Sequence, residues 1–326
     1  MSVIVHHAGM HSMLVDSGRE FHRSSGIAPG GPMDPFAYQA GNYLVGNDQP
    51  ATAIEFFQSG PELEFMLPTL VAITGPGSGG LLDGKKVMAW RPIFIEKGSI
   101  LRLSISREGA FGYLNIQGGW KSQNWLGSGS THLAARIGGH EGRLLMKHDE
   151  LNFRTEFKGY GNKADLNWNI SENELYDIYS TEKHISCIRG PENVIIDSAL
   201  SEKFVSQPYR ISSKSNRMGY RLSGEHLTMN RKIEMISSPV DFGTIQLLPD
   251  GQLAVLMADH QTTGGYPRLA TVIRADFPRL AQFSRSRDLY FSWCTPEVAY
   301  GLLNDRNQKL RELKNSCFLR LKQYLH

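Results

Sequence analysis

The chain has 326 residues, of which 40% are hydrophobic and 21% are charged, as in an ordinary soluble globular protein. Two domains are expected, because this length exceeds a single comfortable core. The net charge of +3, with Lys and Arg scattered, gives no support for nucleic-acid binding, and no apolar stretch is long enough to span a membrane. Since the first residues also lack a signal-peptide pattern and the three cysteines lack metal spacing, we expect a cytoplasmic protein.

Short apolar runs punctuated by Gly or Pro recur along the chain and predict a mainly β architecture of barrels or sandwiches. Such runs have the length of strands, and the residues between them are typical of tight turns. Helices are expected to be few and short, apart from one at the C-terminus. The clearest strand candidates are Leu70 to Thr74, Ile100 to Ile105, Tyr113 to Ile116, Ile233 to Ile236 and Leu253 to Met257.

Three stretches carry helical patterns. Asp34-Pro35 provides a capping carboxylate and a proline at the first helical position, and Gly46 is the expected stop. A shorter helix is predicted from Asp276 through Ala281. The clearest pattern runs from Pro296 to Leu325, where apolar residues recur at helical spacing among charged ones. If this helix is interrupted, we expect the break near Asn304-Asp305.

The chain becomes polar and loses its periodicity between Phe157 and Lys183, which marks the best candidate for a domain junction. The sequence therefore predicts an N-terminal β-barrel-like domain over residues 1–157 and a polar junction over 158–183. A second domain follows over 184–295, and the C-terminal helix occupies 296–326.

Two glycine-rich stretches imitate nucleotide-binding loops. Gly75 to Gly80 follows a predicted strand, and Gly79 to Lys85 approximates a phosphate loop. However, Asp83-Gly84 indicates a hairpin rather than the start of a helix, and Lys86 stands where magnesium binding would need a hydroxyl. Both stretches are therefore interpreted as hairpin glycines.

The most polar loop follows the apolar run that ends near Met257. From Asp259 to Tyr266 it contains a carboxylate, an imidazole, an amide, two hydroxyls and a phenol, with Gly264-Gly265 and then Pro267 at its end. A loop that only reverses the chain needs fewer donors and acceptors, and the two glycines would let a ligand approach the backbone closely. A turn capped by Asp259 is an equally open interpretation.

Two other loops have a functional and a structural interpretation. Within residues 214–222, Arg217 and Arg221 flank a Gly-Tyr turn and could clamp a carboxylate or phosphate. Alternatively, they form a solvated edge in which the arginine stems cover Tyr220. Residues 26–34 lead into a helix N-terminus that offers N–H groups to an anion, although simple capping is the favoured interpretation.

Taken together, these stretches resemble the allophanate hydrolase subunit 2 family, also called the KipA family. It includes the C subunit of 5-oxoprolinase and the carboxyltransferase region of urea carboxylase. The resemblance runs in order from about residue 3 to about residue 295. It rests on motifs at 26–34, 41–47, 59–61, 118–119, 130–144, 189–191, 216–222, 237–246 and 259–267. There are departures: Gly129 stands where the family usually has Arg, and His148 stands where it usually has Gly.

The resemblance implies a mainly β protein of two cyclophilin-like β-barrel domains that acts with partner proteins. The implied function is that of the C subunit of an ATP-dependent 5-oxoprolinase, which opens 5-oxo-L-proline to L-glutamate. The implied partners are a KipI-like B subunit and a LamB/YcsF-like A subunit. Two alternatives stay open. One is a biotin-dependent carboxyltransferase module acting on urea or another small amide, although the chain lacks a Met-Lys-Met-type biotinylation site. The other is a KipA-type regulatory protein that binds a kinase inhibitor.

Under the leading hypothesis the cofactor is ATP, biotin belongs only to the carboxyltransferase alternative, and no metal is predicted. Both reactions need hydrogen-bond donors aimed at an amide oxygen that becomes anionic. We expect arginines and glycine amides to supply them, and a carboxylate to act as acid or base. The predicted catalytic residues are Asp259, Glu55 and Arg217. The predicted substrate-binding residues are Arg221, Tyr220, Gln246, Gln261, Thr262, Thr263, Gly264, Gly265, Tyr266 and Asp34. For Glu55 and Asp34, a purely structural role in holding loops is an open alternative.

Overall fold

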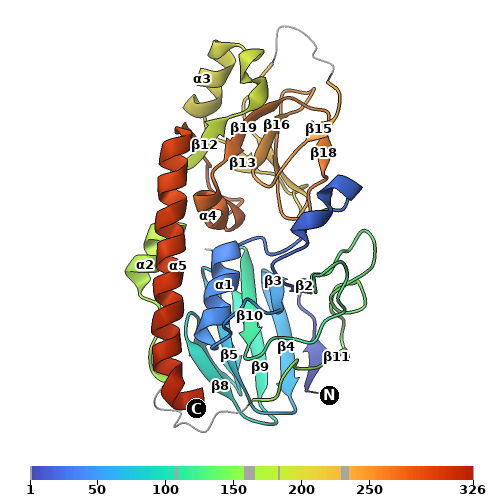
Figure 1. Cartoon of the computed structure of the whole chain (residues 1–326), viewed down its shortest axis with the longest axis vertical. Coiled ribbons are helices and arrows are strands. Elements are labelled where there is room, and N and C mark those ends of the chain that lie inside the picture. Colours follow the sequence, from blue (N-terminus) through green and yellow to red (C-terminus); the bar gives the residue numbers. More distant parts are fainter. Residues whose placement is uncertain (1, 107–108, 158–165, 183, 229–234, 326) are drawn as a thin grey trace. The chain divides into compact units, whose positions relative to one another are not determined.

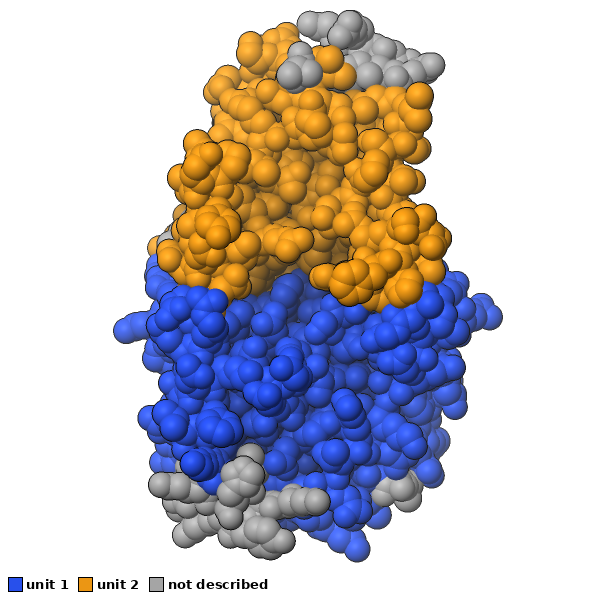
Figure 2. Space-filling model, in the orientation of Figure 1, with its two compact units in different colours: residues 1–18, 30–179, 308–326 blue, residues 19–29, 180–307 orange. Residues whose placement is uncertain are grey.

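The computed structural model describes residues 2–106, 109–157, 166–182, 184–228 and 235–325. The chain folds into two compact units, which Figure 2 shows in different colours. Unit 1 consists of residues 1–18, 30–179 and 308–326, and unit 2 consists of residues 19–29 and 180–307. The passage from Tyr179 to Ser180 lies inside the polar stretch predicted as the junction. Residues 19–29 join unit 2, although no pattern in the sequence separates them from their neighbours.

Unit 1 contains two antiparallel sheets (Figure 1). The six-stranded sheet has the order β11 (Glu150–Leu151), β1 (Val3–His7), β4 (Ser59–Phe65), β9 (Ile100–Ile105), β6 (Ser78–Leu82) and β7 (Lys85–Met88). The five-stranded sheet has the order β2 (His11–Val15), β3 (Ala53–Phe57), β10 (Phe111–Ile116), β5 (Thr69–Thr74) and β8 (Pro92–Ile95). The mainly β class is therefore confirmed, and the predicted strands at Leu70, Ile100 and Tyr113 are present.

The two sheets share one hydrophobic core. β9 alternates between exposed and buried residues, as expected for a strand with one face toward the core. By contrast, β5 and β10 are buried at every position, because helix α1 (Pro35–Leu44) packs on these two strands. The core is mainly aliphatic and includes Val3, Val5, Leu63, Val71, Ile73, Leu101, Leu103, Leu114 and Ile116.

Helix α1 begins and packs for reasons that are visible in the sequence. The Asp34 side chain accepts a hydrogen bond from the Ala37 N–H at 3.0 Å, which confirms the predicted cap. A Cβ atom on Gly41 would lie 2.1 Å from Asn115 Oδ1 on β10, so the close approach of helix and sheet requires glycine here. Asn42 Oδ1 accepts from the Asn47 side chain at 2.7 Å, which ties down the segment after the helix. The motif at 41–47 is thus a folding motif.

The glycine-rich stretch near residue 80 is a hairpin, as predicted. β6 and β7 pair directly, and the turn between them has positive φ angles at Asp83 (50°) and Gly84 (78°). Asp83 Oδ1 also accepts from the Ile100 N–H at 2.8 Å, which binds the turn to β9. Two adjacent residues with positive φ are typical of a type I′ hairpin turn. The nucleotide-loop interpretation has no helix N-terminus to support it here.

Unit 2 is built on one seven-stranded sheet. Its order is β13 (Arg210–Ile211), β14 (Gly219–Ser223), β17 (Leu253–Leu256), β16 (Thr244–Leu247), β19 (Arg268–Val272), β12 (Ile185–Arg189) and β20 (Phe291–Trp293). A two-stranded ribbon, β15 (Ser238–Pro239) with β18 (Thr263–Gly264), completes the strands described in this unit. Its short helical segments in the described ranges are η1 (Glu20–Ser25), η3 (Pro191–Val194), α3 (Ser198–Ser206), η4 (Arg274–Asp276) and α4 (Phe277–Ala281), and residues 296–307 of the C-terminal helix also belong to it.

Helix α5 (Pro296–Leu325) runs for 30 residues without interruption, so the expected break near Asn304-Asp305 is wrong. Weak helix formers cost only about 0.5–0.7 kcal/mol each relative to alanine, and long packed helices tolerate them. Leu310, Cys317 and Leu321 form its buried stripe. Within unit 1, Lys314 pairs with Asp48 at 2.7 Å. Of the helices in the described ranges, none combines the length and apolar character needed to cross a membrane.

Two helices were not predicted. α2 (Glu172–Tyr179) begins after Ser171, whose hydroxyl and the Glu174 carboxylate form a capping box. α3 begins after Asp197, which accepts from the Ala199 N–H at 3.0 Å. The strand predicted at 233–236 is not found at residues 235 and 236, and residues 233 and 234 lie outside the described part of the chain.

Candidate functional site

One face of the seven-stranded sheet carries a row of polar residues. The strand register pairs Arg221 of β14 with Ala254 of β17, Ala254 with Gln246 of β16, and Gln246 with Arg268 of β19. Residues paired in this way point to the same side of a sheet. The intervening positions, such as Ile245 and Val255, are fully buried on the other side. Alternation along four strands therefore brings Arg221, Gln246 and Arg268 onto one surface of unit 2.

The β15–β18 ribbon lies against this face. A Cβ atom on Gly264 would be only 2.3 Å from Gln246 Nε2, and the Arg268 guanidinium donates to the Pro239 carbonyl at 2.8 Å. Gln246 is accordingly 2% exposed. Neither Gly264 nor Gly265 has a positive φ angle. The close approach that Gly264 permits is thus filled by Gln246, whereas a ligand role for the glycine amides stays a prediction.

Arg268 is fixed in turn by Glu192. The Arg268 Nε donates to Glu192 Oε2 at 2.8 Å, and a second guanidinium nitrogen pairs with Oε1 at 2.5 Å. This pairing lowers the pKa of Glu192 below its ordinary value. Gly190, which follows β12, lies so close to the neighbouring strand β19 that only glycine fits. A Cβ atom there would lie 1.8 Å from the Arg268 carbonyl oxygen. The motif at 189–191 therefore serves to dock the η3 turn beside the polar face.

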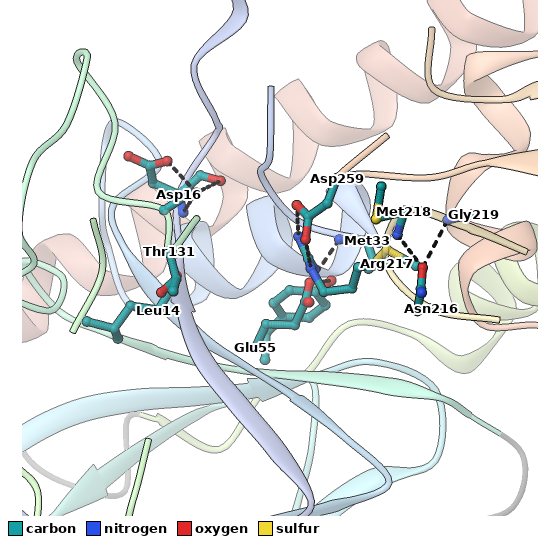
Figure 3. Close-up of polar contacts among 12 residues, drawn as sticks. Leu14, Asp16, Met33, Glu55, Thr131, Asn216, Arg217, Met218, Gly219 and Asp259 are labelled. Atoms are coloured by element: carbon teal, nitrogen blue, oxygen red, sulfur yellow. Dashed lines mark hydrogen bonds and ion pairs between the residues drawn. The ribbon is translucent and has the colours of Figure 1, made fainter. Parts of the chain in front are cut away.

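Arg217 and Asp259 form a bidentate ion pair (Figure 3). Arg217 Nε donates to Asp259 Oδ2 at 2.8 Å, and Nη2 donates to Oδ1 at 3.0 Å. The Asp259 N–H also donates to the Arg217 carbonyl at 2.9 Å. Only 7% of the Arg217 side chain and 23% of the Asp259 side chain are exposed. In the described part of the chain, the Asp259 carboxylate accepts from the Arg217 guanidinium and from no backbone N–H of its own turn.

The turn predicted at Gly219-Tyr220 is wrong. Both residues lie in strand β14, and the turn precedes them, with the Asn216 side chain accepting from the Met218 N–H at 2.8 Å (Figure 3). Tyr220 is 6% exposed, and its hydroxyl donates to the Ala281 carbonyl at 2.9 Å. It points to the core side of the sheet, while Arg221 is exposed on the other side. No residue in the described part of the chain pairs with the Arg221 guanidinium.

The loop from Asp259 to Tyr266 has a hydrogen-bonded backbone and three exposed side chains. The His260 N–H donates to the Met257 carbonyl at 3.1 Å, and the Val240 N–H donates to the Thr262 carbonyl at 3.1 Å. Gln261, Thr263 and Tyr266 are exposed. A rigid loop that displays an amide, a hydroxyl and a phenol is suited to binding a small polar ligand. This arrangement favours the ligand-binding interpretation of the loop.

Glu55 and Asp34 belong to unit 1, where they hold the start of α1. Glu55 Oε2 accepts from the Met33 N–H at 2.8 Å (Figure 3) and from the Tyr113 hydroxyl at 2.7 Å. The Asp34 N–H donates to the same hydroxyl at 2.8 Å, and Asp34 Oδ2 accepts from Tyr179 at 2.8 Å. Burial, with the negative charges of Glu55 and Asp34, raises the pKa of Tyr113 well above its ordinary value. These contacts favour the structural alternative for Glu55 and Asp34, in which the two carboxylates hold loops in place.

Residues 128–130, where Gly129 stands in place of the arginine usual in the family, are held by Asp16. The sequence analysis did not select Asp16. The Asp16 carboxylate accepts from Ser130 Oγ at 2.7 Å and from the Gly18 N–H at 2.9 Å, and Ser128 Oγ also donates to it. A Cβ atom on Gly129 would lie 2.2 Å from Ser122 Oγ. Hydroxyl groups thus occupy the space where a longer side chain would begin.

The predicted site residues are therefore divided between the two units. Asp34 and Glu55 lie in unit 1, and all the others lie in unit 2. Within unit 2 the structure joins Arg217 to Asp259 and Gln246 to Gly264, and it places Tyr220 on the opposite side of the sheet. Sequence reasoning assigned no role to His260, Glu192, Arg268, Tyr113 or Asp16.

Comparison with known proteins identifies the family. The model of the carboxyltransferase domain, subdomains A and B, matches residues 25–293. The chain belongs to this carboxyltransferase-domain family. Among its relatives, the 5-oxoprolinase C subunit of Escherichia coli is 36% identical over 310 residues, which cover 94% of this chain and 96% of that protein. The protein of the same name from Haemophilus influenzae is 36% identical over 82% of this chain and 84% of its own length.

Solved structures share the fold of this carboxyltransferase-domain chain. Urea amidolyase of K. lactis superimposes with a TM-score of 0.84 over 96% of this chain, at 23% sequence identity. The chain spans only 20% of that much longer protein. The likeness therefore concerns the fold of one region of urea amidolyase.

Proposed function

We propose that this chain is the C subunit of a 5-oxoprolinase and that it acts with partner proteins in the ATP-dependent opening of 5-oxo-L-proline to L-glutamate. The observation that carries the proposal is the 36% identity to the 5-oxoprolinase C subunit of Escherichia coli over nearly the full length of both chains. The proposed partners are a KipI-like B subunit and a LamB/YcsF-like A subunit.

The chemistry of the reaction fits the polar face of unit 2. The five-membered lactam is an unstrained amide, and phosphorylation of its oxygen by ATP would make its carbon a far better electrophile. A site for such an amide needs donors directed at an oxygen that becomes anionic. Arg221 provides an exposed guanidinium on the same unit as the largely buried Arg217–Asp259 pair. In this proposal Arg221 binds the anionic groups of the substrate, and the pair fixes the loop that carries Gln261, Thr262 and Thr263.

The roles proposed for the two carboxylates differ in kind. Asp259 is 23% exposed and can reach a ligand from its ion pair with Arg217. Glu55 is 1% exposed and accepts from a backbone N–H and a tyrosine hydroxyl. We therefore assign the acid–base role to Asp259 and a structural role to Glu55. Asp34, Gln246 and Tyr220 take structural roles by the same argument from burial and partners.

The test is glutamate formation from 5-oxoproline and ATP by purified A and B subunits, with and without this chain. Activity that depends on this chain supports the proposal. Arg221→Gln should then raise KM for 5-oxoproline about tenfold or more, as expected for one lost charged hydrogen bond. Arg210→Gln is a matched control, because Arg210 is also exposed on this sheet but pairs with Asp288 at 2.7 Å.

The alternatives predict other results in the same assay. Carboxyl transfer predicts consumption of urea or another small amide with a carboxylated biotin donor and no glutamate. Regulatory binding predicts a stable complex with the B subunit that turns over neither substrate. An assembled complex of all three proteins without glutamate formation would refute the proposed function.

A further inference from the structure

His260 is the second residue of the polar loop, yet it is 1% exposed and cannot reach a ligand directly. Its ring Nδ1 lies 2.6 Å from the carbonyl oxygen of Gln261. A carbonyl oxygen can only accept, so Nδ1 must carry the proton. In the neutral ring the other nitrogen, Nε2, then has a lone pair and no hydrogen. The geometry thus fixes the tautomer of this histidine.

The other side of the ring faces charged groups. Nε2 is buried and has no hydrogen-bond partner among the residues that the structure describes, and Asp241 Oδ1 lies 3.9 Å away. Asp241 also pairs with Arg23 at 3.3 Å. Three charged residues therefore surround the imidazole, namely Asp241, Asp259 and Arg23. Burial, assisted by Arg23, lowers the pKa of His260 below its ordinary value against the opposing effect of the two carboxylates. The ring is thus neutral at physiological pH.

The contact with Gln261 completes the bracing of the loop backbone. On one side of Gln261, the Asp259 N–H donates to the Arg217 carbonyl. On the other side, the Thr262 carbonyl accepts from Val240. Among the described contacts, only the His260 imidazole hydrogen-bonds to the Gln261 carbonyl, which lies between these two contacts. Loss of this contact would free the part of the loop that displays Gln261 and Thr262.

We propose that His260 is a positioning residue of this site: its Nδ1–H holds the Gln261 carbonyl and thereby orients the side chains that bind the ligand. When Nε2 gains a proton it becomes a donor, and Asp241 then competes with the Gln261 carbonyl for the imidazole. A shift of the ring by about 1 Å would bring Nε2 within hydrogen-bonding distance of Asp241 Oδ1. That shift lengthens the bond to Gln261. Loop order therefore decreases when His260 becomes charged.

Two amide substitutions separate this role from simple packing. In His260→Asn the side-chain nitrogen takes the place of Nδ1 and can still donate to Gln261, whereas His260→Gln places its amide nearer the position of Nε2. Both variants are neutral and similar in size. We expect backbone hydrogen exchange in residues 257–266 to accelerate at least about fivefold in His260→Gln, since one hydrogen bond contributes about 1 kcal/mol. His260→Asn should stay within about twofold of the unsubstituted protein.

Nitrogen NMR of the protein labelled with ¹⁵N-histidine provides an independent arm. The resonances that disappear in His260→Asn should be those of a neutral ring protonated at Nδ1. A ring protonated at Nε2, or equal exchange rates in the two variants, would overturn the proposal. Neither measurement needs enzymatic activity, so the failure of this proposal is distinguishable from failure of the proposed 5-oxoprolinase function.

A third arm rests on that proposed function. In the assembled complex, His260→Gln should lower kcat/KM about five- to tenfold, and His260→Asn should restore most of it. The acid limb of the pH profile should move in His260→Asn, because this variant keeps the donor but cannot bind a proton. Equal losses in both variants with an unchanged profile would contradict positioning by His260.

Discussion

Gly264 is the position at which the packing of unit 2 can be tested most directly. A methyl group there would lie 2.3 Å from Gln246 Nε2 and 3.2 Å from Val240 Cγ1, well inside normal contact distance. Gly264→Ala should therefore force either the buried Gln246 amide or the β15–β18 ribbon to move. Overpacking of this kind costs about 1–3 kcal/mol of unfolding free energy.

The matched control is the next residue along the chain. A methyl group on Gly265 would meet nothing closer than Ser237 Oγ at 3.4 Å, and neither glycine has a positive φ angle. Gly265→Ala should therefore change the free energy of unfolding by less than about 0.5 kcal/mol or raise it slightly, because alanine restricts the unfolded chain.

The double variant decides whether Gln246 is the cause. Gln246 Nε2 has no hydrogen-bond partner among the described residues, so its truncation to alanine leaves no former partner of that nitrogen unsatisfied. In the Gln246→Ala background, Gly264→Ala should cost less than about 0.5 kcal/mol, which gives a coupling energy of about 0.5–3 kcal/mol. Urea unfolding measures each corner of the cycle. Additive free energies would refute the argument that Gln246 requires glycine at 264.

Two further substitutions test the remaining contacts. Tyr113→Phe removes a hydroxyl that donates to the buried Glu55 carboxylate and should lower the free energy of unfolding by about 1–3 kcal/mol in urea titrations. Tyr209→Phe is its control: this hydroxyl donates to the Phe204 carbonyl and interacts with the uncharged Gln207 side chain but contacts no carboxylate among the described partners, so its loss should cost about 1 kcal/mol. Asp259→Asn leaves the Arg217 guanidinium without its carboxylate and should lower turnover by the assembled complex tenfold or more, a result that unchanged kinetics would contradict.

Local patterns were sufficient for the elements that begin or turn within a few residues. Asp34-Pro35 predicted the start of α1, and Asp83-Gly84 predicted the hairpin, because capping and positive φ angles depend on adjacent residues. The start of α2 could have been found in the same way, since Ser171 and Glu174 have the spacing of a capping box.

The site depends on contacts that no local pattern contains. Arg217 and Asp259 are 42 residues apart in the chain and meet only because β14 and β17 are neighbours. Gly264 was predicted to let a ligand approach the backbone closely, whereas the group that lies against it is the Gln246 side chain, which sheet register places there. The polar residues of a loop can thus mark it as a candidate ligand-binding loop. Which residues those side chains contact is decided by the order of the strands in the sheet.

Acidification should destabilise unit 2 in two separate pH ranges. The pKa of His260 is lowered from 6.5, so at a slightly acidic pH the unfolded chain binds a proton that the folded chain does not. Stability therefore falls as the pH drops below about 6.5, by at most about 1.4 kcal/mol per pH unit for this group. The Arg268 pairing lowers the pKa of Glu192 from 4.5, so its contribution is present above that value and is lost as the pH falls through the folded-state pKa.

Each range has its own variant. Urea unfolding of His260→Asn between about pH 8 and pH 3 should lack the upper decrease and keep the lower one, because asparagine does not titrate. Glu192→Gln should keep the upper decrease and lose part of the lower one, along with some stability at neutral pH from the weakened Arg268 contact. An upper decrease that persists in His260→Asn would mean that the burial of this imidazole does not control the acid response of unit 2.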